Sequence, residues 1–280
     1  MKTKTYVVTG SASGIGKALI TELAKENIVF AGYRNNIHEP SLRLISPNIY
    51  PFFVDYSNPE TIKKAYKYIL SKCTKIDTLV NIAGCVVAGP VEKINIDEIK
   101  RQFNVNVFGH IELTQGLMPI LQDGKIINVS SMASFGIFPF ISPYCASKRC
   151  LDMFFNSLLI ENKKNIKVVS VKPGVIATPL WLKSIDENSK YFDDYGDYSD
   201  EMKYLISNAQ KNTTAGLSVN KVVEVILKAD KLKNPKLSYT VGFDALVANI
   251  ISKLPQSMIN KIIKAGIFLK TKNIRKTNKV

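Results

Sequence analysis

Short apolar runs alternate along the chain with stretches of helical periodicity. The runs are rich in β-branched and aromatic residues, and several lack period-2 alternation, which is typical of strands covered on both faces. They are TYVVTG (5–10), NIVFAGY (27–33), IYPFFVD (49–55), DTLVNIAG (77–84), GKIINVSS (124–131), IKVVSVKPG (166–174) and LSYTVG (237–242). Between them, the periodicity predicts helices at about 15–26, 58–72, 96–121, 143–162 and 219–229. This order predicts an α/β fold, a single-domain Rossmann-like doubly wound parallel sheet with helices on both faces.

The composition is globular, with 46% hydrophobic and 22% charged residues. No apolar stretch approaches about 18 residues, so no spanning helix is expected, and the first apolar run is too short for a signal peptide. The four cysteines form no CxxC pair and the chain has only two histidines. We therefore expect no metal site, and reduced thiols in a cytoplasmic protein.

The net charge of +15 comes mostly from lysines spread over the whole chain, with only five arginines. A nucleic-acid surface would need clustered arginines and aromatic stacking residues, so no nucleic-acid partner is expected. The segment 251–280 departs from the even spread, since it carries eight basic residues and no acid. We expect a main domain over 1–250 and a basic extension over 251–280.

A glycine-rich turn, TGSASGIG, follows the first strand. Glycine lets a backbone approach a ligand closely, and the helix that follows offers amides and a dipole to a phosphate. The candidate phosphate-binding residues are Thr9, Gly10, Ser11, Ser13, Gly14, Ile15 and Gly16. The alternative is an ordinary tight turn.

The ends of the second and third strands carry two further candidates. Arg34 stands where dinucleotide-binding sheets often have a ribose-binding carboxylate. A guanidinium would pair with a 2′-phosphate, so NADP(H) is favoured over NAD(H), unless Arg34 is only a surface residue. Asp55 could accept from an adenine amino group or, like Ser57, cap the next helix.

Tyr144 and Lys148 lie four residues apart in SPYCASK, within a predicted helix. This spacing puts both on one face. A cation at about 4 Å in an effective dielectric of about 20 stabilises a phenolate by about 4 kcal/mol. That corresponds to about three pKa units, which would bring the pKa of Tyr144 toward neutrality. By itself, such a pair also occurs by chance on many helices.

The motifs taken together resemble the short-chain dehydrogenase/reductase family over about residues 4–245. TGSASGIG resembles its TGxxxGxG turn, NIAG (81–84) its NNAG segment, YCASK its YxxxK motif, and KPGVIAT its PGxxxT segment. Asn106 and Ser131 match the family's asparagine and serine, Ser131 lying thirteen residues before Tyr144. One departure is Ile82, which replaces the second asparagine of NNAG.

The resemblance implies roles for these residues. Tyr144 would be the general acid/base, Lys148 would hold the nicotinamide ribose and lower the tyrosine pKa, and Ser131 would bind the reacting oxygen. Asn106 would distort its helix locally and support a water next to Lys148. Asn81, Ala83 and Gly84 would lie beside the adenine ribose, and Pro173, Gly174 and Thr178 would bracket the nicotinamide. Cys145 would be a packed small residue rather than a redox-sensitive thiol.

The resemblance also places a mobile substrate lid at about 178–215. This segment contains Trp181, Tyr191, Phe192, Tyr195, Tyr198 and Tyr204, which would face an apolar substrate or anchor the lid. The stretch NPKLSYTVGFDA (234–245) resembles the tail of a subgroup similar to 17β-hydroxysteroid and retinol dehydrogenases, with Leu237 in place of its arginine. The implied substrate is a small lipophilic alcohol or carbonyl compound.

Residues 255–270 have apolar residues at helical spacing with lysines between them. Such a helix could lie on an anionic membrane surface, on its own domain, or on a second subunit of a homo-oligomer. The sequence therefore predicts an NADP(H)-dependent oxidoreductase in the cytoplasm or at a membrane surface. The alternative is a non-catalytic dinucleotide-binding sensor or interaction protein.

Overall fold

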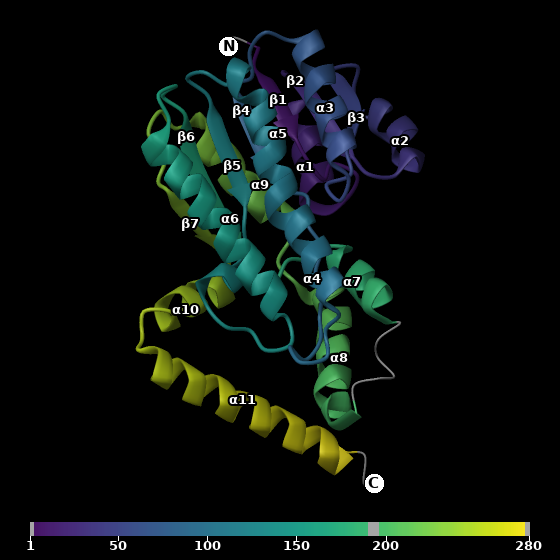
Figure 1. The fold of residues 1–280 in the computed structure, drawn as a ribbon, viewed down its shortest axis with the longest axis vertical. Coiled ribbons are helices and arrows are strands. Elements are labelled where there is room, and N and C mark those ends of the chain that lie inside the picture. The colour runs from purple at the N-terminus through teal and green to yellow at the C-terminus, as the bar shows by residue number, and fades with distance from the viewer. Residues whose placement is uncertain (1–2, 190–195, 278–280) are drawn as a thin grey trace.

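The computed structural model describes residues 3–189 and 196–277, with residues 189 and 267–277 as backbone only. A seven-stranded parallel sheet runs through the described part in the order β3-β2-β1-β4-β5-β6-β7 (Figure 1). Its strands are β1 (Thr5–Val8), β2 (Ile28–Tyr33), β3 (Ile49–Phe53), β4 (Thr78–Asn81), β5 (Lys125–Val129), β6 (Lys167–Pro173) and β7 (Ser238–Val241). All seven predicted strands and the doubly wound fold are confirmed. Most strands end before their apolar runs do, because the last residues leave the sheet to form the loops at its carboxyl edge.

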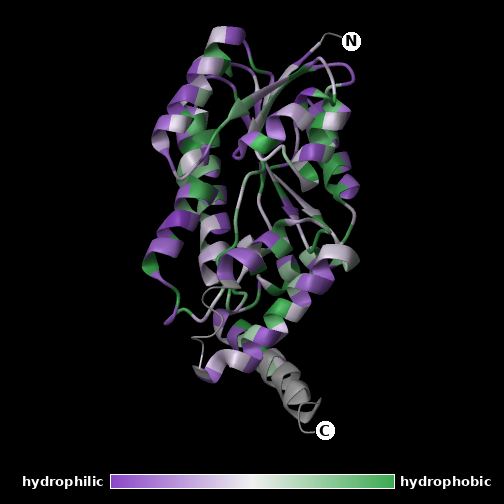
Figure 2. Ribbon diagram, turned by 90° about the vertical axis from the view of Figure 1, so that its right-hand side faces the viewer, coloured by the Kyte–Doolittle hydropathy of each residue, from purple (hydrophilic) through white to green (hydrophobic). Residues whose placement is uncertain are grey.

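Successive residues of the strands are buried on opposite faces of the sheet. In β1, Val7 belongs to one apolar cluster and Val8 to the other, and Ile126 and Ile127 of β5 divide in the same way. Helices α1 (Gly14–Leu23) and α9 (Val219–Lys231) cover one face, and α3 (Pro59–Lys72), α5 (Gly109–Leu117) and α6 (Ser142–Glu161) cover the other. Figure 2 shows these helices with apolar stripes turned inward and polar stripes outward. Burial on both faces explains why the strands lack alternation.

The helix predicted at 96–121 is not continuous. It consists of α4 (Ile96–Phe103), a π-helical turn over Asn104–Phe108, α5, and a 3₁₀ turn over Met118–Ile120. The widened turn is centred on Asn106, so the local distortion expected there is present. π-turns of this kind often occur at functional sites. A short helix that the periodicity did not predict, α2 (Glu39–Arg43), follows a 3₁₀ turn at Asn36–His38.

The predicted lid contains two helices, α7 (Leu180–Ser189) and α8 (Ser199–Ala215). Tyr191, Phe192 and Tyr195 lie outside the described residues. The chain ends in α10 (Phe243–Ile251) and α11 (Gln256–Thr277), and α11 runs past the end of α8 (Figure 1).

The described part of α11 packs partly on its own domain. Ile259 is only 6% exposed, whereas Met258 and Ile262 are each 48% exposed. Packing on its own domain, one of the three predicted arrangements of this segment, is therefore present at Ile259. In the described part of the chain, no helix is both long enough and apolar enough to cross a bilayer.

The amino-terminal edge of the sheet is joined by one buried carboxylate. Asp230, near the end of α9, accepts hydrogen bonds from Lys4 Nζ (2.8 Å), the Tyr6 hydroxyl (2.8 Å) and Thr78 Oγ1 (2.5 Å). Its backbone carbonyl accepts from Lys125. Burial raises the pKa of this carboxyl, but the three hydrogen bonds outweigh it and hold the pKa below its usual value. The side chain of Asp230 thus ties α9 to β4 and to β1 with the residue before it, and its backbone carbonyl adds a contact to β5.

We predict that Asp230→Ala lowers the free energy of unfolding by about 3 kcal/mol, because two buried hydroxyls lose their acceptor. The melting temperature should fall by about 5–10 °C. The kcat of the remaining folded protein should be unchanged, since the network lies at the edge opposite the candidate site. Asp97→Ala is the matched control, because Asp97 is exposed and pairs only with Lys100 on its own helix. Equal melting temperatures for the two variants would contradict this account.

Candidate active site

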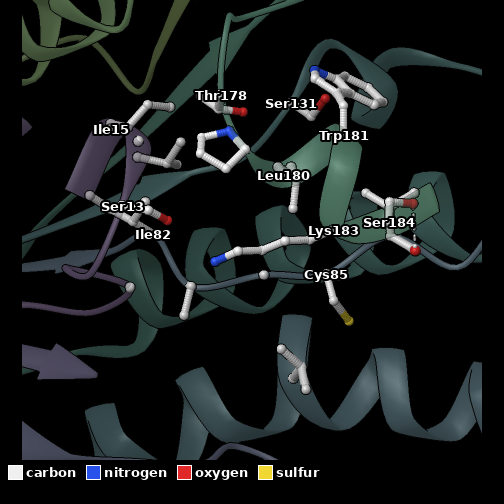
Figure 3. A pocket seen from close by; sticks show the side chains of 18 of the residues that line it. Ser13, Ile15, Ile82, Cys85, Ser131, Thr178, Leu180, Trp181, Lys183 and Ser184 are labelled. Carbon is white, nitrogen blue, oxygen red and sulfur yellow. Dashed lines mark hydrogen bonds between the residues drawn. The ribbon is translucent and has the colours of Figure 1, made fainter. Parts of the chain in front are cut away.

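A cavity of about 490 Å³ opens at the carboxyl edge of the sheet, lined by the β1–α1 turn, the loops after β2 to β6, α6 and α7 (Figure 3). The predicted residues that line it are Gly10, Ser13, Gly14, Ile15, Arg34, Asp55, Ala83, Gly84, Ser131, Tyr144, Lys148, Pro173, Gly174 and Thr178. Thr9, Ser11, Gly16, Asn81 and Asn106 are not part of its lining. Ile82, the departure from the family motif, does line it.

The glycine turn presents backbone rather than side chains to the cavity. Gly10 and Gly14 have φ values of +67° and +53°, which L-residues with a Cβ rarely adopt. Ser13 caps α1 without a side-chain hydrogen bond, and the first turn of α1 holds no acidic residue. The first amides of α1 therefore face the cavity without a competing anion, which suits a phosphate.

The predicted residues outside the lining hold the turn and its neighbours together. Thr9 Oγ1 accepts from the amides of Ile82 (2.9 Å) and Ala83 (3.2 Å), and Ser11 Oγ donates to the carbonyl of Val8 (2.9 Å). Gly16 packs so closely on the carbonyl of Gly10 that a Cβ would overlap it.

Asn81 lies inside the sheet rather than beside the cavity. Its Nδ2 donates to Asn128 Oδ1 on β5 at 2.9 Å. The structure therefore places this side chain between β4 and β5.

Arg34 is partly exposed at the cavity rim, and its guanidinium lies 3.6 Å from the carboxylate of Glu187 on α7. Asp55 also lines the cavity, and its carboxylate accepts from the amide (2.9 Å) and hydroxyl (2.7 Å) of Ser57. The cap of α3 is neither Asp55 nor Ser57 but Asn58, which accepts from the amide of Glu60.

Tyr144, Lys148 and Ser131 meet at the inner end of the cavity. Tyr144 and Lys148 share one face of α6, and Lys148 Nζ lies 5.8 Å from the centre of the tyrosine ring. The ammonium donates to the carbonyl of Val129 at 3.0 Å. Ser131 hydrogen-bonds to the Tyr144 hydroxyl and accepts from the amide of Ala133 at 3.1 Å. The three polar groups thus converge on one point.

The expected lowering of the tyrosine pKa is not present in the structure. Burial raises the pKa of Tyr144 to about 12, and the hydrogen bond from Ser131 opposes this shift without cancelling it. Burial also lowers the pKa of Lys148 to about 8, although Asp152 acts in the other direction. A cation about 4 Å away in a polar medium would lower the tyrosine pKa. In the structure both side chains are buried, and the cost of burying a phenolate raises the pKa instead.

Asn106 supports this group from behind. Its Oδ1 accepts from the amide of Cys85 (2.9 Å), and its Nδ2 donates to the carbonyl of Cys85 (3.0 Å) and to Ser147 Oγ (3.0 Å). The π-turn therefore fixes both the β4–α4 loop and α6 next to Lys148. Cys145 is buried, with its thiol 3.9 Å from the carbonyl of Phe138, and burial raises its pKa, as expected for a packed residue.

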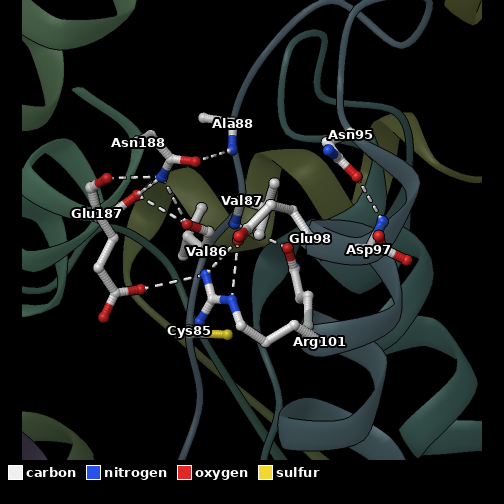
Figure 4. Close-up of polar contacts among 12 residues, drawn as sticks. Cys85, Val86, Val87, Ala88, Asn95, Asp97, Glu98, Arg101, Glu187 and Asn188 are labelled. Atoms are coloured by element: carbon white, nitrogen blue, oxygen red, sulfur yellow. Dashed lines mark hydrogen bonds and ion pairs between the residues drawn. The ribbon is translucent and has the colours of Figure 1, made fainter. Parts of the chain in front are cut away.

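Trp181 of the predicted lid lies on α7 and lines the cavity, but the sequence did not predict the polar residues of this helix that lie in or next to the cavity wall. Lys183 extends from α7 into it (Figure 3), and Ser184 and Asn188 donate to the carbonyl of Val86 at 3.0 Å each. Glu187 pairs with Arg101 at 3.3 Å, and Arg101 in turn pairs with Glu98 (Figure 4). The i, i+4 spacing of Ser184 and Asn188 was the available signal, but their partner is a backbone atom far away in sequence.

Asp244, which was also not predicted as a site residue, holds the loop after β6. Its carboxylate accepts from the amide of Val175 at 2.6 Å and from the amide of Ala245 at 2.9 Å. It sits directly against Gly174, where a Cβ would overlap it. The VGFDA stretch thus positions the Pro173–Gly174 segment in the cavity wall.

His110 is buried beneath the site. Its Nε2 lies 2.8 Å from the carbonyl of Ala83, and its ring packs edge-on against Tyr56. Burial and the nearby Lys148 lower the pKa of this histidine to about 3, against the opposing effect of the Ala83 carbonyl. The folded protein therefore keeps this imidazole neutral.

Comparison with known proteins identifies the family. A family model described as short chain dehydrogenase matches residues 4–189. An NADPH-dependent 3-dehydrocapnine reductase from Ornithobacterium rhinotracheale is 32% identical over 270 residues, covering 91% of this chain and 94% of that protein. Mouse estradiol 17-beta-dehydrogenase 2 is 29% identical over 289 residues, covering 95% and 75%. A short chain dehydrogenase structure from Burkholderia cenocepacia in complex with NADP has a TM-score of 0.72 at 21% identity, covering 94% and 98%.

We predict that His110 makes the protein sensitive to mild acid. Its pKa in the folded protein lies below the unfolded value of about 6.5, so below pH 6.5 the unfolded chain binds a proton at this histidine and the folded protein does not. The stability is fully present above pH 6.5, and about 2 kcal/mol should be lost between pH 7 and pH 5. Melting temperatures over this range measure the loss.

His110→Gln should flatten that pH dependence. His38→Gln is the matched control, because His38 is the other histidine of the chain and lies at the cavity rim. The interpretation fails if His110→Gln and the wild type lose the same stability between pH 7 and pH 5.

Proposed function

The chain belongs to the short-chain dehydrogenase family of oxidoreductases, and on that premise we propose that it interconverts a lipophilic secondary alcohol and its ketone or aldehyde with NADP(H). The observation that carries the proposal is the convergence of Tyr144, Lys148 and Ser131 at the inner end of a cavity whose outer end is the glycine turn and Arg34. Such an arrangement suits a dinucleotide bound along the cavity with its reactive end at Tyr144.

The residues present fit an NADP(H) cofactor. The open amides of α1 would hold the diphosphate, and Lys183 would add a positive charge beside them. Arg34 would bind the 2′-phosphate, for which the carboxylate of Glu187, 3.6 Å from the guanidinium, would compete. In support, the reductase from Ornithobacterium rhinotracheale is named as NADPH-dependent. NAD(H) is the alternative, since an arginine does not exclude a free 2′-hydroxyl.

The chemistry requires a hydride and a proton, and the bound cofactor supplies or accepts the hydride. Tyr144 would give its hydroxyl proton to the carbonyl oxygen in reduction and take it back in oxidation. Ser131 would donate to the same oxygen and hold it in line with the tyrosine. Lys148 would orient the cofactor ribose and stabilise the phenolate that reduction leaves behind.

The resting site holds the two groups in the protonation states that reduction would use. With a pKa of about 12, Tyr144 is protonated at neutral pH and holds the proton that reduction consumes. Lys148, with a pKa of about 8, is mostly charged at pH 7 and can balance the negative charge that forms. Oxidation would instead need a phenolate before the reaction starts.

The wall nearest Tyr144 supports a lipophilic substrate. Phe138, Ile141, Leu180 and Trp181 line the cavity there, and the indole Nε1 of Trp181 already donates to the carbonyl of Ile176 at 3.2 Å. This wall therefore contributes apolar surface to a ligand. Contact of α11 with an anionic membrane stays a prediction, supported by its lysines and by the exposed Met258 and Ile262.

We predict that Tyr144→Phe lowers kcat about 10²–10⁴-fold, since general acid catalysis has this magnitude, while NADPH affinity changes less than about twofold because the ring is kept. The assay follows nicotinamide absorbance with a panel of aliphatic ketones, steroids and retinoids, alongside calorimetric titration of NADPH. A non-catalytic sensor would bind NADPH in both forms and turn over no ketone in either. Turnover by the variant at the wild-type rate would refute the proposed acid.

We also predict that Arg34→Ala weakens NADPH binding about 30-fold and NADH binding less than about threefold, because a charge-assisted pair with the phosphate is lost. Glu187→Gln should have the opposite effect and strengthen NADPH binding a few-fold, since it removes a competing carboxylate. Arg43→Ala is the matched control, as Arg43 is exposed and pairs with Glu39 outside the cavity lining. Equal loss of both cofactors in Arg34→Ala would remove the assignment.

A further inference from the structure

A second cavity, of about 660 Å³, lies between the loop 132–141 and helices α8, α10 and α11. Apolar side chains, above all isoleucine and phenylalanine, supply most of its lining. Of the two carboxylates in the lining, Asp244 is held by the amides of Val175 and Ala245, whereas Glu201 has one buried oxygen without a hydrogen-bond partner among the described residues. Ser252 donates to a carbonyl at the end of its own helix. Away from Glu201, the cavity thus suits a ligand segment without polar groups.

This second cavity adjoins the active site. Met132, Phe138 and Ile141 line both cavities. Met132 follows Ser131 directly, and Phe138 and Ile141 pack in the same small cluster as Tyr144. The boundary between the two spaces is therefore formed by side chains that surround the reacting groups.

The walls that close the second cavity come from the end of the chain. Helices α8, α10 and α11 all lie beyond residue 189, where the match to the family model ends. Figure 1 shows α11 passing below the sheet domain from α10 toward α8. The described part of α11 contributes Ile259, Ile262 and Ile263 to the lining. The amphipathic segment near the C-terminus is thus the floor of an apolar space.

Because Met132, Phe138 and Ile141 line both cavities, a ligand that occupies both must pass these side chains. A flexible chain needs a narrower opening between them than a rigid fused-ring system. The volume is in the usual range for a ligand site. Each methylene group that the apolar walls cover adds to the binding free energy. We infer that this cavity binds an unbranched alkyl chain of the substrate, whose reacting carbon lies at Tyr144. The position of the reacting carbon rests on the proposed function.

A series of straight-chain methyl ketones from butan-2-one to undecan-2-one tests the inference in the wild-type protein with NADPH. The kcat/KM should rise about threefold for each added methylene, in line with the burial of one CH₂. A decalone, with a carbon count inside the series but a fused-ring skeleton, should gain much less than decan-2-one. A constant kcat/KM along the series would overturn the inference while leaving the proposed function intact.

Ala248→Phe fills the cavity from α10 and should remove the dependence on chain length, with kcat/KM for butan-2-one within about twofold of wild type. Leu246→Phe is the matched control, because Leu246 is on the same helix, is 47% exposed and does not line the cavity. If Ala248→Phe melts at a lower temperature, Ile262→Trp fills the cavity from α11 instead. Retention of the chain-length dependence in both filled variants would also overturn the inference.

A binding measurement separates this inference from the proposed function. Calorimetric titration of undecan-2-one should show binding to the wild type and to Leu246→Phe, and at least tenfold weaker binding to Ala248→Phe. This result supports the alkyl site even if no ketone is turned over. Turnover of short ketones without measurable binding of undecan-2-one would refute the alkyl site alone.

Discussion

The central strands of the sheet, β1, β2, β4, β5 and β6, are buried on both faces, and this burial decides where the protein can do chemistry. Polar side chains inside the layers must find partners there, as Asn81 does with Asn128. Polar groups that are to meet a ligand can stand only where the strands end. The glycine turn, Arg34, Ser131 and the Pro173–Gly174 segment all occupy such positions. Helix α6 completes the site because its amino-terminal half extends beyond the sheet edge with Tyr144 and Lys148.

Burial also determines the electrostatics of the site. Lys148 is 4% exposed and donates to the carbonyl of Val129, and burial lowers its pKa to about 8 against the opposing effect of Asp152, while Tyr144 stays protonated in the same enclosure. The pKa of Tyr144 is therefore higher than in water, and the pKa of Lys148 is lower. A proton donor and a cation placed together in this way are suited to a reaction that transfers a proton and creates a negative charge. The π-turn at Asn106 and the buried His110 hold the loop beneath them.

Much of the fold and of the site could be predicted from the sequence because the signals are local. Apolar runs without alternation located the strands, the i, i+4 spacing put Tyr144 and Lys148 on one helix face, and the family resemblance added Ser131. The sequence could not show which side chains face the cavity: Thr9 and Asn81 were predicted as cofactor-binding residues, and their side chains bond to neighbouring protein groups and are not part of the cavity lining. It also could not predict the bonds from Ser184 and Asn188 to Val86, because these join segments about 100 residues apart. The direction of the Tyr144 pKa shift was wrong for the same reason, since enclosure depends on the whole fold.

The hydrogen-bond network around Asp230 lies at the opposite end of the strands from the cavity. The network joins α9 to β1, β4 and β5, which are the central strands of the sheet. Residues in the loops at the carboxyl edge can therefore be substituted without disturbing this network. The stability that the network provides can offset the loss of stability that such substitutions cause. A scaffold arranged in this way has room to evolve: new substrate preferences can arise by drift in α7, α8 and the C-terminal helices while the chain continues to fold.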